Sequence, residues 1–214
     1  MNLLLLFGTV VGVAAILLSG LIQAATGYRI RALLLAGAAG GWATLYAAGL
    51  LATSLSSHEV LLPVGATKRF CGFYLDCHIG VAVVEAREAS ALGDRRAGGV
   101  YRVVTLRVSS NALRAALTPG ALRVDLVGTD GRRYARDLLA EAALPRAGGA
   151  LEREIPAGGA YEVTVVFDVP AGVSADRLFV GEGRGVDLAI ERMLIGDDDS
   201  FLHARTMLAL PVSS

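Results

Sequence analysis

The sequence predicts a helical membrane hairpin followed by an all-β sandwich of the immunoglobulin type. Two long stretches without a charged side chain open the chain, at residues 1–28 and 32–57. Beyond residue 58 the apolar pattern changes to the two-residue period of β-strands, with turn signals between the runs. We therefore expect residues 1–57 to form a transmembrane helical hairpin and residues 58–214 to form an antiparallel β-sandwich.

The two uncharged stretches each exceed the roughly 20 apolar residues that cross a bilayer as a helix. We place the spans at about residues 3–25 and 33–53. The connector Tyr28–Ala32 is so short that the helices must run antiparallel, and both ends of the hairpin then emerge on the same side of the membrane. The domain that follows is expected on that side.

Positive charge beside the spans predicts the orientation, because Lys and Arg next to a span favour the cytoplasm. The connector holds Arg29 and Arg31, whereas the first basic residue after the second stretch is Lys68. We therefore expect a protein of the inner (cytoplasmic) membrane with both termini outside and the sandwich in the periplasm. A signal peptide cleaved near Ala24 and Ala25 is the alternative, and it would leave the second stretch as the anchor.

Glycine pairs one helical turn apart occur in both spans. They are Gly8 with Gly12 and Gly37 with Gly41. Small residues at this spacing let helix backbones approach closely, so we expect them to close the hairpin, with a dimer seam as the alternative. Neither span contains Asp, Glu, Lys, Arg or His, so nothing indicates an ion path.

The charge balance argues against one class of function. The chain carries 20 basic and 20 acidic side chains. Because Arg29 and Arg31 belong to the hairpin, the part from residue 58 onward is slightly acidic. It offers no basic face, which argues against binding to nucleic acid.

The strand-like runs are rich in Val, Tyr, Phe and Thr, as strands prefer. They cover residues 79–87, 100–108, 121–127, 132–135, 161–169, 177–180, 186–194 and 201–210. The run 161–169 alternates most cleanly, and Asp130-Gly131 marks a hairpin turn. A short helix is expected at residues 136–143. Seven or more strands at this spacing suggest a sandwich of the immunoglobulin type.

Three segments each carry one motif, and the motifs follow one another along the chain. Residues 100–111 form a predicted strand ending in Asn111, residues 122–134 an Asp130-Gly131 hairpin ending in Tyr134, and residues 158–170 end in Phe167-Asp-Val-Pro. In the order of these motifs, residues 79–180 resemble a bacterial family of extracytoplasmic immunoglobulin-like domains of unknown function. Members of that family are often lipoproteins or are otherwise anchored to the membrane. The resemblance implies a fold and a compartment but no catalytic residues. The chain departs from the family by lacking a lipobox cysteine, and the hairpin stands in its place.

Both cysteines, Cys71 and Cys77, lie within one short segment. Outside the cytoplasm such a pair is expected to form a disulfide. On one straight strand their Cα atoms would lie roughly 20 Å apart. A disulfide requires about 4.4–6.8 Å, so we expect a turn within the segment.

A metal site is the alternative use of this segment. Cys71, Cys77 and His78 are competent ligands, and His203 or His58 would complete a set. The spacing Cys-x5-Cys-His is not that of a zinc ribbon or of a Cys-x-x-Cys redox pair. The acidic run 197–199 is expected as a solvated loop, since it lacks the alternate ligand spacing of a calcium loop.

The sequence holds no catalytic motif, since a Gly-x-Ser-x-Gly elbow is absent and the glycine-rich run 181–185 lacks the lysine of a phosphate loop. We expect no enzyme and no cofactor. The expected function is non-covalent binding to another envelope component, with the lipid bilayer and an envelope protein as partners. Two alternatives stay open: a metal- or redox-linked envelope protein that uses Cys71, Cys77 and His78, and an accessory subunit of a larger membrane complex.

Overall fold

The computed structural model describes residues 2–70, 77–144, 151–182 and 185–211. The chain forms two compact units. The first consists of Met1–His58 together with Leu188–Ala204, and the second of Glu59–Asp187 together with Arg205–Ser214. Each unit is therefore built from two separate stretches of the chain.

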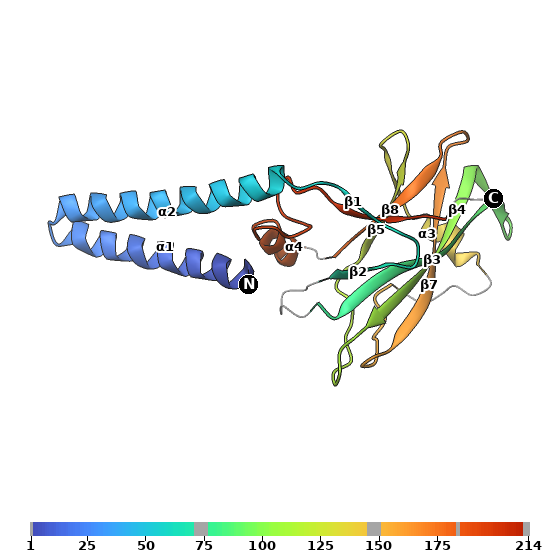
Figure 1. The fold of residues 1–214 in the computed structure, drawn as a ribbon, viewed down its shortest axis with the longest axis horizontal. Coiled ribbons are helices and arrows are strands. Elements are labelled where there is room, and N and C mark those ends of the chain that lie inside the picture. Colours follow the sequence, from blue (N-terminus) through green and yellow to red (C-terminus); the bar gives the residue numbers. More distant parts are fainter. Residues whose placement is uncertain (1, 71–76, 145–150, 183–184, 212–214) are drawn as a thin grey trace. The chain divides into compact units, whose positions relative to one another are not determined.

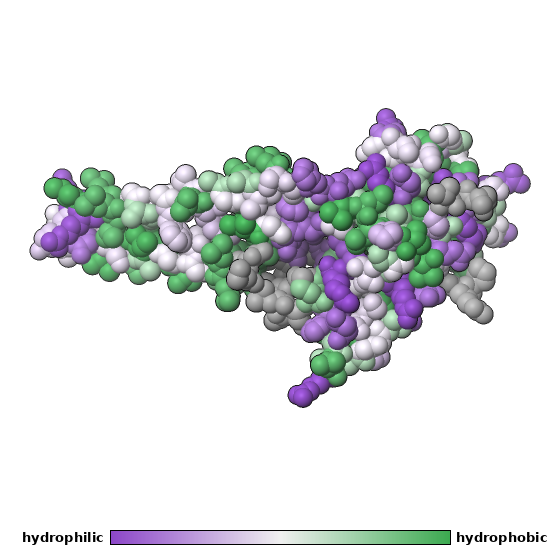
Figure 2. Space-filling model, viewed as in Figure 1, coloured by the Kyte–Doolittle hydropathy of each residue, from purple (hydrophilic) through white to green (hydrophobic). Residues whose placement is uncertain are grey.

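The first unit contains a hairpin of two long helices, α1 (Asn2–Ala25) and α2 (Arg29–Leu55) (Figure 1). Gly27 has φ +88° at the turn between them, a backbone conformation that glycine adopts without strain. Both helices are long and apolar enough to cross a membrane. Figure 2 shows apolar residues spread over the visible surface of the hairpin.

Among the hairpin glycines, Gly20 faces the other helix, since an added Cβ there would lie 3.6 Å from the carbonyl oxygen of Ala32. The other motif glycines do not make this contact. An added Cβ at Gly8, Gly12, Gly37 or Gly41 would meet no described atom within 4 Å. The prediction that these pairs close the hairpin is therefore wrong, because α1 and α2 face each other through a different stripe of residues.

The second unit is a β-sandwich of two sheets (Figure 1). One sheet has the strand order β1 (Val60–Leu62), β9 (Thr206–Ala209), β8 (Ala175–Gly181), β5 (Arg123–Gly128) and β6 (Arg133–Ala135). The other has the order β2 (Thr67–Phe70), β3 (Ile79–Leu92), β4 (Arg95–Ser110) and β7 (Ala160–Val169). The predicted sandwich is thus confirmed.

The strand directions differ from the prediction at one edge, where β1 pairs with β9 in parallel. The other pairs of described strands are antiparallel. Both β1 and β9 begin where the chain leaves the first unit, and the backbone N–H of Val60 bonds to the carbonyl of Arg205 there. The two strands therefore run in the same direction, and the sandwich departs from the all-antiparallel immunoglobulin arrangement.

The main core lies between the sheets and follows the expected alternation. Along β7, alternate residues from Tyr161 to Val169 are buried. Val166, on the opposite face of β7, is buried as well. It forms a second apolar cluster with Tyr101 and Val103 of β4 and with Ala140 of the short helix α3 (Leu138–Ala142), which covers this face. The expected helix at residues 136–143 is thus confirmed, and it creates a second, smaller core.

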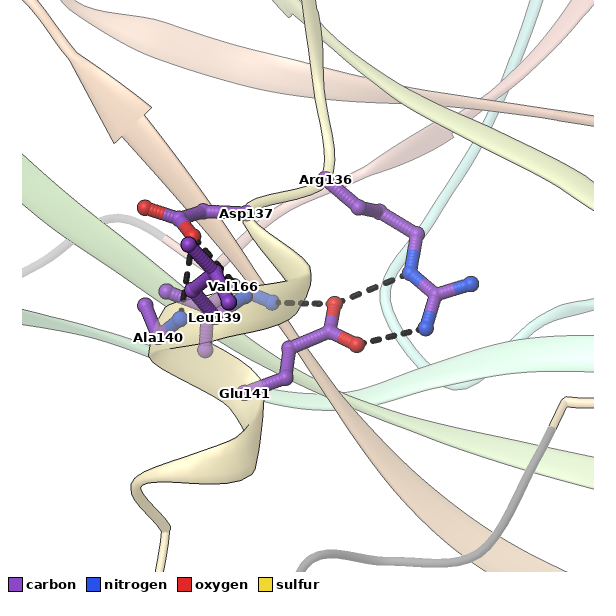
Figure 3. A network of polar contacts seen from close by, with 6 residues as sticks. All are labelled: Arg136, Asp137, Leu139, Ala140, Glu141 and Val166. Atoms are coloured by element: carbon purple, nitrogen blue, oxygen red, sulfur yellow. Dashed lines mark hydrogen bonds and ion pairs between the residues drawn. The ribbon is translucent and has the colours of Figure 1, made fainter.

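A polar network fastens α3 to β7 (Figure 3). The carboxylate of Glu141 accepts from the Arg136 guanidinium at 2.9 and 2.5 Å and from the backbone N–H of Val166 at 3.0 Å. Asp137 caps the helix, since its Oδ1 accepts from the backbone N–H groups of Leu139 and Ala140. The helix is therefore held from both its N-terminus and its last turn.

One predicted strand is wrong and another is shorter than expected. Residues 186–191 form the helix α4 (Val186–Glu191) instead of a strand, whereas the predicted run 201–210 contains the strand β9, which covers Thr206–Ala209. The physical reason is tertiary packing, since Ile190 and Leu194 pack with residues of α1 and α2 in the first unit. Strand propensity gives way to burial of these side chains.

Candidate functional site

The segments that carry the family resemblance have structural roles. In β7, the Asp168 carboxylate accepts hydrogen bonds from the backbone N–H groups of Gly98 at 2.7 Å and Gly99 at 3.1 Å. It thereby fixes the path of β4 where that strand meets the end of β7. This contact gives the aspartate of the motif Phe167-Asp-Val-Pro a structural role.

The Asp130-Gly131 turn is a second structural motif. The Asp130 carboxylate accepts from the backbone N–H of Arg132 at 3.0 Å and from the Tyr134 hydroxyl at 2.8 Å. The Arg132 amide is the main reason that the pKa of Asp130 is lowered. Donation to Asp130 raises the pKa of the Tyr134 hydroxyl. The two hydrogen bonds behind these shifts hold the turn together.

The cysteine and histidine candidates do not assemble into a site in the part of the chain that the structure describes. Cys71 lies outside the described residues, so its disulfide with Cys77 stays a prediction. His78 places its Nδ1 2.7 Å from the side-chain amide of Asn111. His203 places its Nδ1 2.7 Å from the Ala204 carbonyl in the other unit. Among the described residues no group of three or more His, Cys, Asp or Glu side chains is placed to hold a metal ion.

The outer face of the β8–β5–β6 region holds a group of charged and aromatic side chains. We call it the Phe179 cluster, and it consists of Arg123, Asp125, Arg133 and Phe179. The guanidinium carbons of Arg133 and Arg123 lie 4.4 and 5.8 Å from the centre of the Phe179 ring. The Lys68 ammonium lies 5.5 Å from the same centre. Such distances allow cation–π attraction.

Strand register places these side chains together. Phe179 lies opposite Asp125 in the β5–β8 pair, and Arg133 lies opposite Val127 in the β5–β6 pair. Alternate residues of β5 and β8 fill the main core, so the residues between them, Phe179 and Asp125 included, face outward. Phe179 is nevertheless buried, since it packs with Val127 and with Met207 of β9.

The guanidinium groups of the cluster remain partly open to solvent. The Arg123 side chain is 63% exposed and the Arg133 side chain 40%, whereas that of Asp125 is 10% exposed. Asp125 accepts from Arg123 at 2.8 and 2.5 Å and lies 3.7 Å from Arg133. The cluster thus holds two guanidinium groups beside one carboxylate, and the exposed edges of the guanidinium groups have the chemistry to bind a carboxylate or phosphate.

Lys68 supports the cluster from within the sandwich. Its side chain, on β2, is buried and donates to the carbonyls of Val180 at 2.8 Å and Thr206 at 3.1 Å. The β8–β9 ladder ends at the Phe179–Met207 pair, just before these carbonyls. The ammonium therefore supplies hydrogen bonds where the two strands part.

Residues 188–204, between β8 and β9, pack in the first unit. Tyr46 of α2 donates from its hydroxyl to the Met193 carbonyl at 2.7 Å. The Ser57 hydroxyl accepts from the Ala204 backbone N–H at 2.7 Å. Leu194 joins a buried apolar cluster whose other members are Leu3, Leu6, Tyr46 and Ile190. This segment is thus fastened to the hairpin by polar and apolar contacts.

The acidic run 197–199 lies in this segment and is less solvated than expected, since Asp199 is buried and Asp197 and Asp198 are partly buried. Asp197 accepts from the Asp199 backbone N–H at 2.9 Å, and its own N–H donates to the Ser200 hydroxyl at 2.9 Å. Burial raises the pKa of the Asp197 carboxyl. The run forms a hydrogen-bonded turn.

Among known proteins, similarity to this chain was found in solved structures. No family model matches the chain, and no curated protein matches it. The secreted protein MPT63 of Mycobacterium tuberculosis is 21% identical, with 60% of this chain and 93% of that chain covered and a TM-score of 0.45. An uncharacterised β-sandwich protein of Clostridium difficile is 9% identical, with 73% and 97% covered and a TM-score of 0.42. The yjhA protein of Bacillus subtilis is 10% identical, with 70% and 98% covered and a TM-score of 0.41.

Proposed function

We propose that this chain is a membrane-anchored, extracytoplasmic β-sandwich that binds an anionic envelope component non-covalently. The observation that supports this most strongly is the Phe179 cluster, in which exposed guanidinium edges surround a fixed aromatic ring. Buried Asp125 orients Arg123 through two hydrogen bonds, so the donors are preorganised for a carboxylate or phosphate group. The function requires no reaction and no cofactor.

The anchor is proposed from the hairpin. Large apolar side chains stay exposed along both helices, among them Leu4, Val11, Leu21, Leu33 and Leu45. Exposed apolar surface of this kind is unfavourable in water and favourable against lipid. Arg29 and Arg31 at the connector favour a cytoplasmic position for the turn, so the sandwich is proposed to lie in the periplasm.

Photo-crosslinking in intact cells tests the binding function. A photoreactive residue in place of Arg133 should give a crosslinked partner, and the same residue in place of Glu154, outside the cluster, should not. In the protein that carries the photoreactive residue at position 133, the additional substitution Arg123→Gln should reduce the yield of the crosslinked complex several-fold. The substitution Arg114→Gln, outside the cluster, should leave that yield unchanged. Recovery of the uncrosslinked chain alone from every position would overturn the proposal.

Reporter fusions at the C-terminus test the orientation. A reporter active only in the periplasm should be active, and activity of a cytoplasm-only reporter would reverse the topology. N-terminal sequencing of the mature protein distinguishes a retained first helix from a cleaved signal peptide.

A second candidate, an accessory subunit of a larger membrane complex, is supported by the glycine pairs. Gly8, Gly12, Gly37 and Gly41 lie open on the hairpin, and small residues on a helix surface suit close packing with another helix. Gly12→Leu and Gly41→Leu should therefore abolish co-purification of a membrane partner. Gly20→Leu would instead disturb the hairpin itself.

A further inference from the structure

The turn at residues 188–195 lies beside a part of α2 whose depth in a bilayer can be calculated. An α-helix rises about 1.5 Å per residue, so Tyr46 lies about 25 Å from Arg29 along α2 and Gly49 about 30 Å. The hydrocarbon core of a bilayer is about 30 Å thick. With Arg29 at its inner edge, Tyr46 lies inside the core and Gly49 at its outer edge. Tilting of the helix would place both residues deeper.

Contacts place the turn at this level. The Tyr46 hydroxyl bonds to the Met193 carbonyl at 2.7 Å, and an added Cβ at Gly49 would lie 3.6 Å from the Ile195 side chain. Leu194 is buried against the hairpin, whereas Met193 is 54% exposed. An exposed apolar side chain is thus held at the outer edge of the hydrocarbon core.

Backbone hydrogen bonding makes this position possible. Non-helical backbone is costly at membrane depth unless its polar groups are satisfied within the protein. The N–H groups of Arg192, Met193 and Leu194 donate to the carbonyls of Leu188, Ile190 and Glu191. The Tyr46 hydroxyl, itself costly in lipid, is satisfied by the Met193 carbonyl. The hydrogen-bonded Asp197 turn comes next in the chain.

We propose that residues 188–195 enter the outer leaflet beside the hairpin, with Met193 against the lipid acyl chains. This inference rests on the proposed transmembrane hairpin. The segment adds a contact with the bilayer that neither crosses it nor belongs to α1 or α2. Its chemistry is that of an interfacial segment, since Met193 would face the acyl chains while the exposed Arg192 beside it would reach the headgroup level, where basic residues are favoured.

Tryptophan quenching in proteoliposomes tests the proposal, because the chain has one tryptophan, Trp42. Native protein, W42F/M193W and W42F/L113W are compared in vesicles of lipids brominated on the acyl chains. Leu113 is 93% exposed on the sandwich and serves as the solvent control. We expect strong quenching for native Trp42 and for M193W, with M193W more sensitive to bromine near the headgroup, and little for L113W.

The outcomes separate the inference from the proposed function. Quenching of native Trp42 with M193W as weakly quenched as L113W would overturn the inference and leave the anchor standing. Failure to quench Trp42 would overturn both. If Met193→Trp prevents folding, carbene labelling of the unmodified protein by a photoreactive lipid replaces it. That reagent should tag Met193 but not Met207, which is buried in the sandwich, and equal labelling of the two would contradict insertion.

Discussion

The Oδ1 atom of Asp168 lies 3.1 Å from the backbone nitrogen of Gly99 and accepts its hydrogen. This bond joins β7 to β4 at a point where the two backbones nearly touch. An added Cβ at Gly99 would lie 2.2 Å from the Val169 carbonyl oxygen and 2.6 Å from the Ala171 nitrogen. Only glycine fits there, and the Asp168 carboxylate anchors the chain around it.

Gly99→Ala should therefore be strongly destabilising, by about 3 kcal/mol or more, because backbone atoms cannot move aside. The matched control is Gly98→Ala, whose Cβ would lie 3.2 Å from an Asp168 oxygen, a side-chain atom that can shift. Thermal unfolding of the detergent-solubilised chain, followed by circular dichroism, measures both. Equal melting temperatures for the two variants would contradict the tight approach.

Lys68→Met should destabilise the sandwich by about 3 kcal/mol. The substitution keeps the apolar stem but removes the ammonium that donates to the carbonyls of Val180 and Thr206, and a hydrogen bond from a charged group contributes about 1.5–3 kcal/mol. Arg69→Met, at the exposed neighbouring position, should change stability by less than about 0.5 kcal/mol. Urea unfolding of the full chain in detergent measures both variants. If Lys68→Met left the free energy of unfolding unchanged, the ammonium would make no net contribution to the stability of the sandwich.

Tyr161→Phe should lower stability at neutral pH by about 1 kcal/mol, since the buried hydroxyl donates to the Leu151 carbonyl. Burial raises the pKa of the Tyr161 hydroxyl in the folded chain. Below the unfolded-state pKa of about 10 both states keep the proton, and above it the unfolded chain releases the proton first. Stability of the native chain should therefore fall as the pH rises above about 10.

In Tyr161→Phe this alkaline loss should be smaller, because the phenylalanine has no proton to release. Unfolding free energies at pH 7 and at about pH 11 measure the difference between variant and native chain. An identical alkaline loss in both would assign the effect to other tyrosines.

Glu141→Ala should release α3 from β7. It removes the acceptor for Arg136 and for the Val166 N–H together, so we expect a loss of about 2 kcal/mol. Hydrogen exchange at the Val166 amide should accelerate more than at amides of the main core. Glu162→Ala, an exposed position on the same strand, is the control and should leave the exchange of Val166 unchanged.

Local patterns predicted much of the fold. The uncharged stretches gave α1 and α2, the two-residue period gave the sandwich strands, and Asp130-Gly131 gave the β5–β6 turn. These features depend on neighbours in sequence. Val166 shows the limit, since its burial depends on α3, which no alternation along β7 reveals.

The errors and omissions arise from long-range contacts. Residues 186–191 are helical because Ile190 packs with Leu3 and Leu6, far away in the sequence. The Phe179 cluster depends on the register of β5, β6 and β8, which the sequence does not reveal. The only local indication of the cluster is that Arg123 and Arg133 lie on predicted strands at positions that face outward. The glycine pairs were misassigned because spacing along a helix does not say which face meets the partner.

The burial of Lys68 has a consequence for chemical probing of this protein. It is the chain's sole lysine, and it is only 5% exposed. Amine-directed reagents, the usual choice for finding binding partners in cells, would find no accessible side-chain target on the folded sandwich. Conversely, acylation of Lys68 would require β8 and β9 to separate locally. The rate of acylation at this single lysine would therefore measure how often the sandwich opens between these two strands.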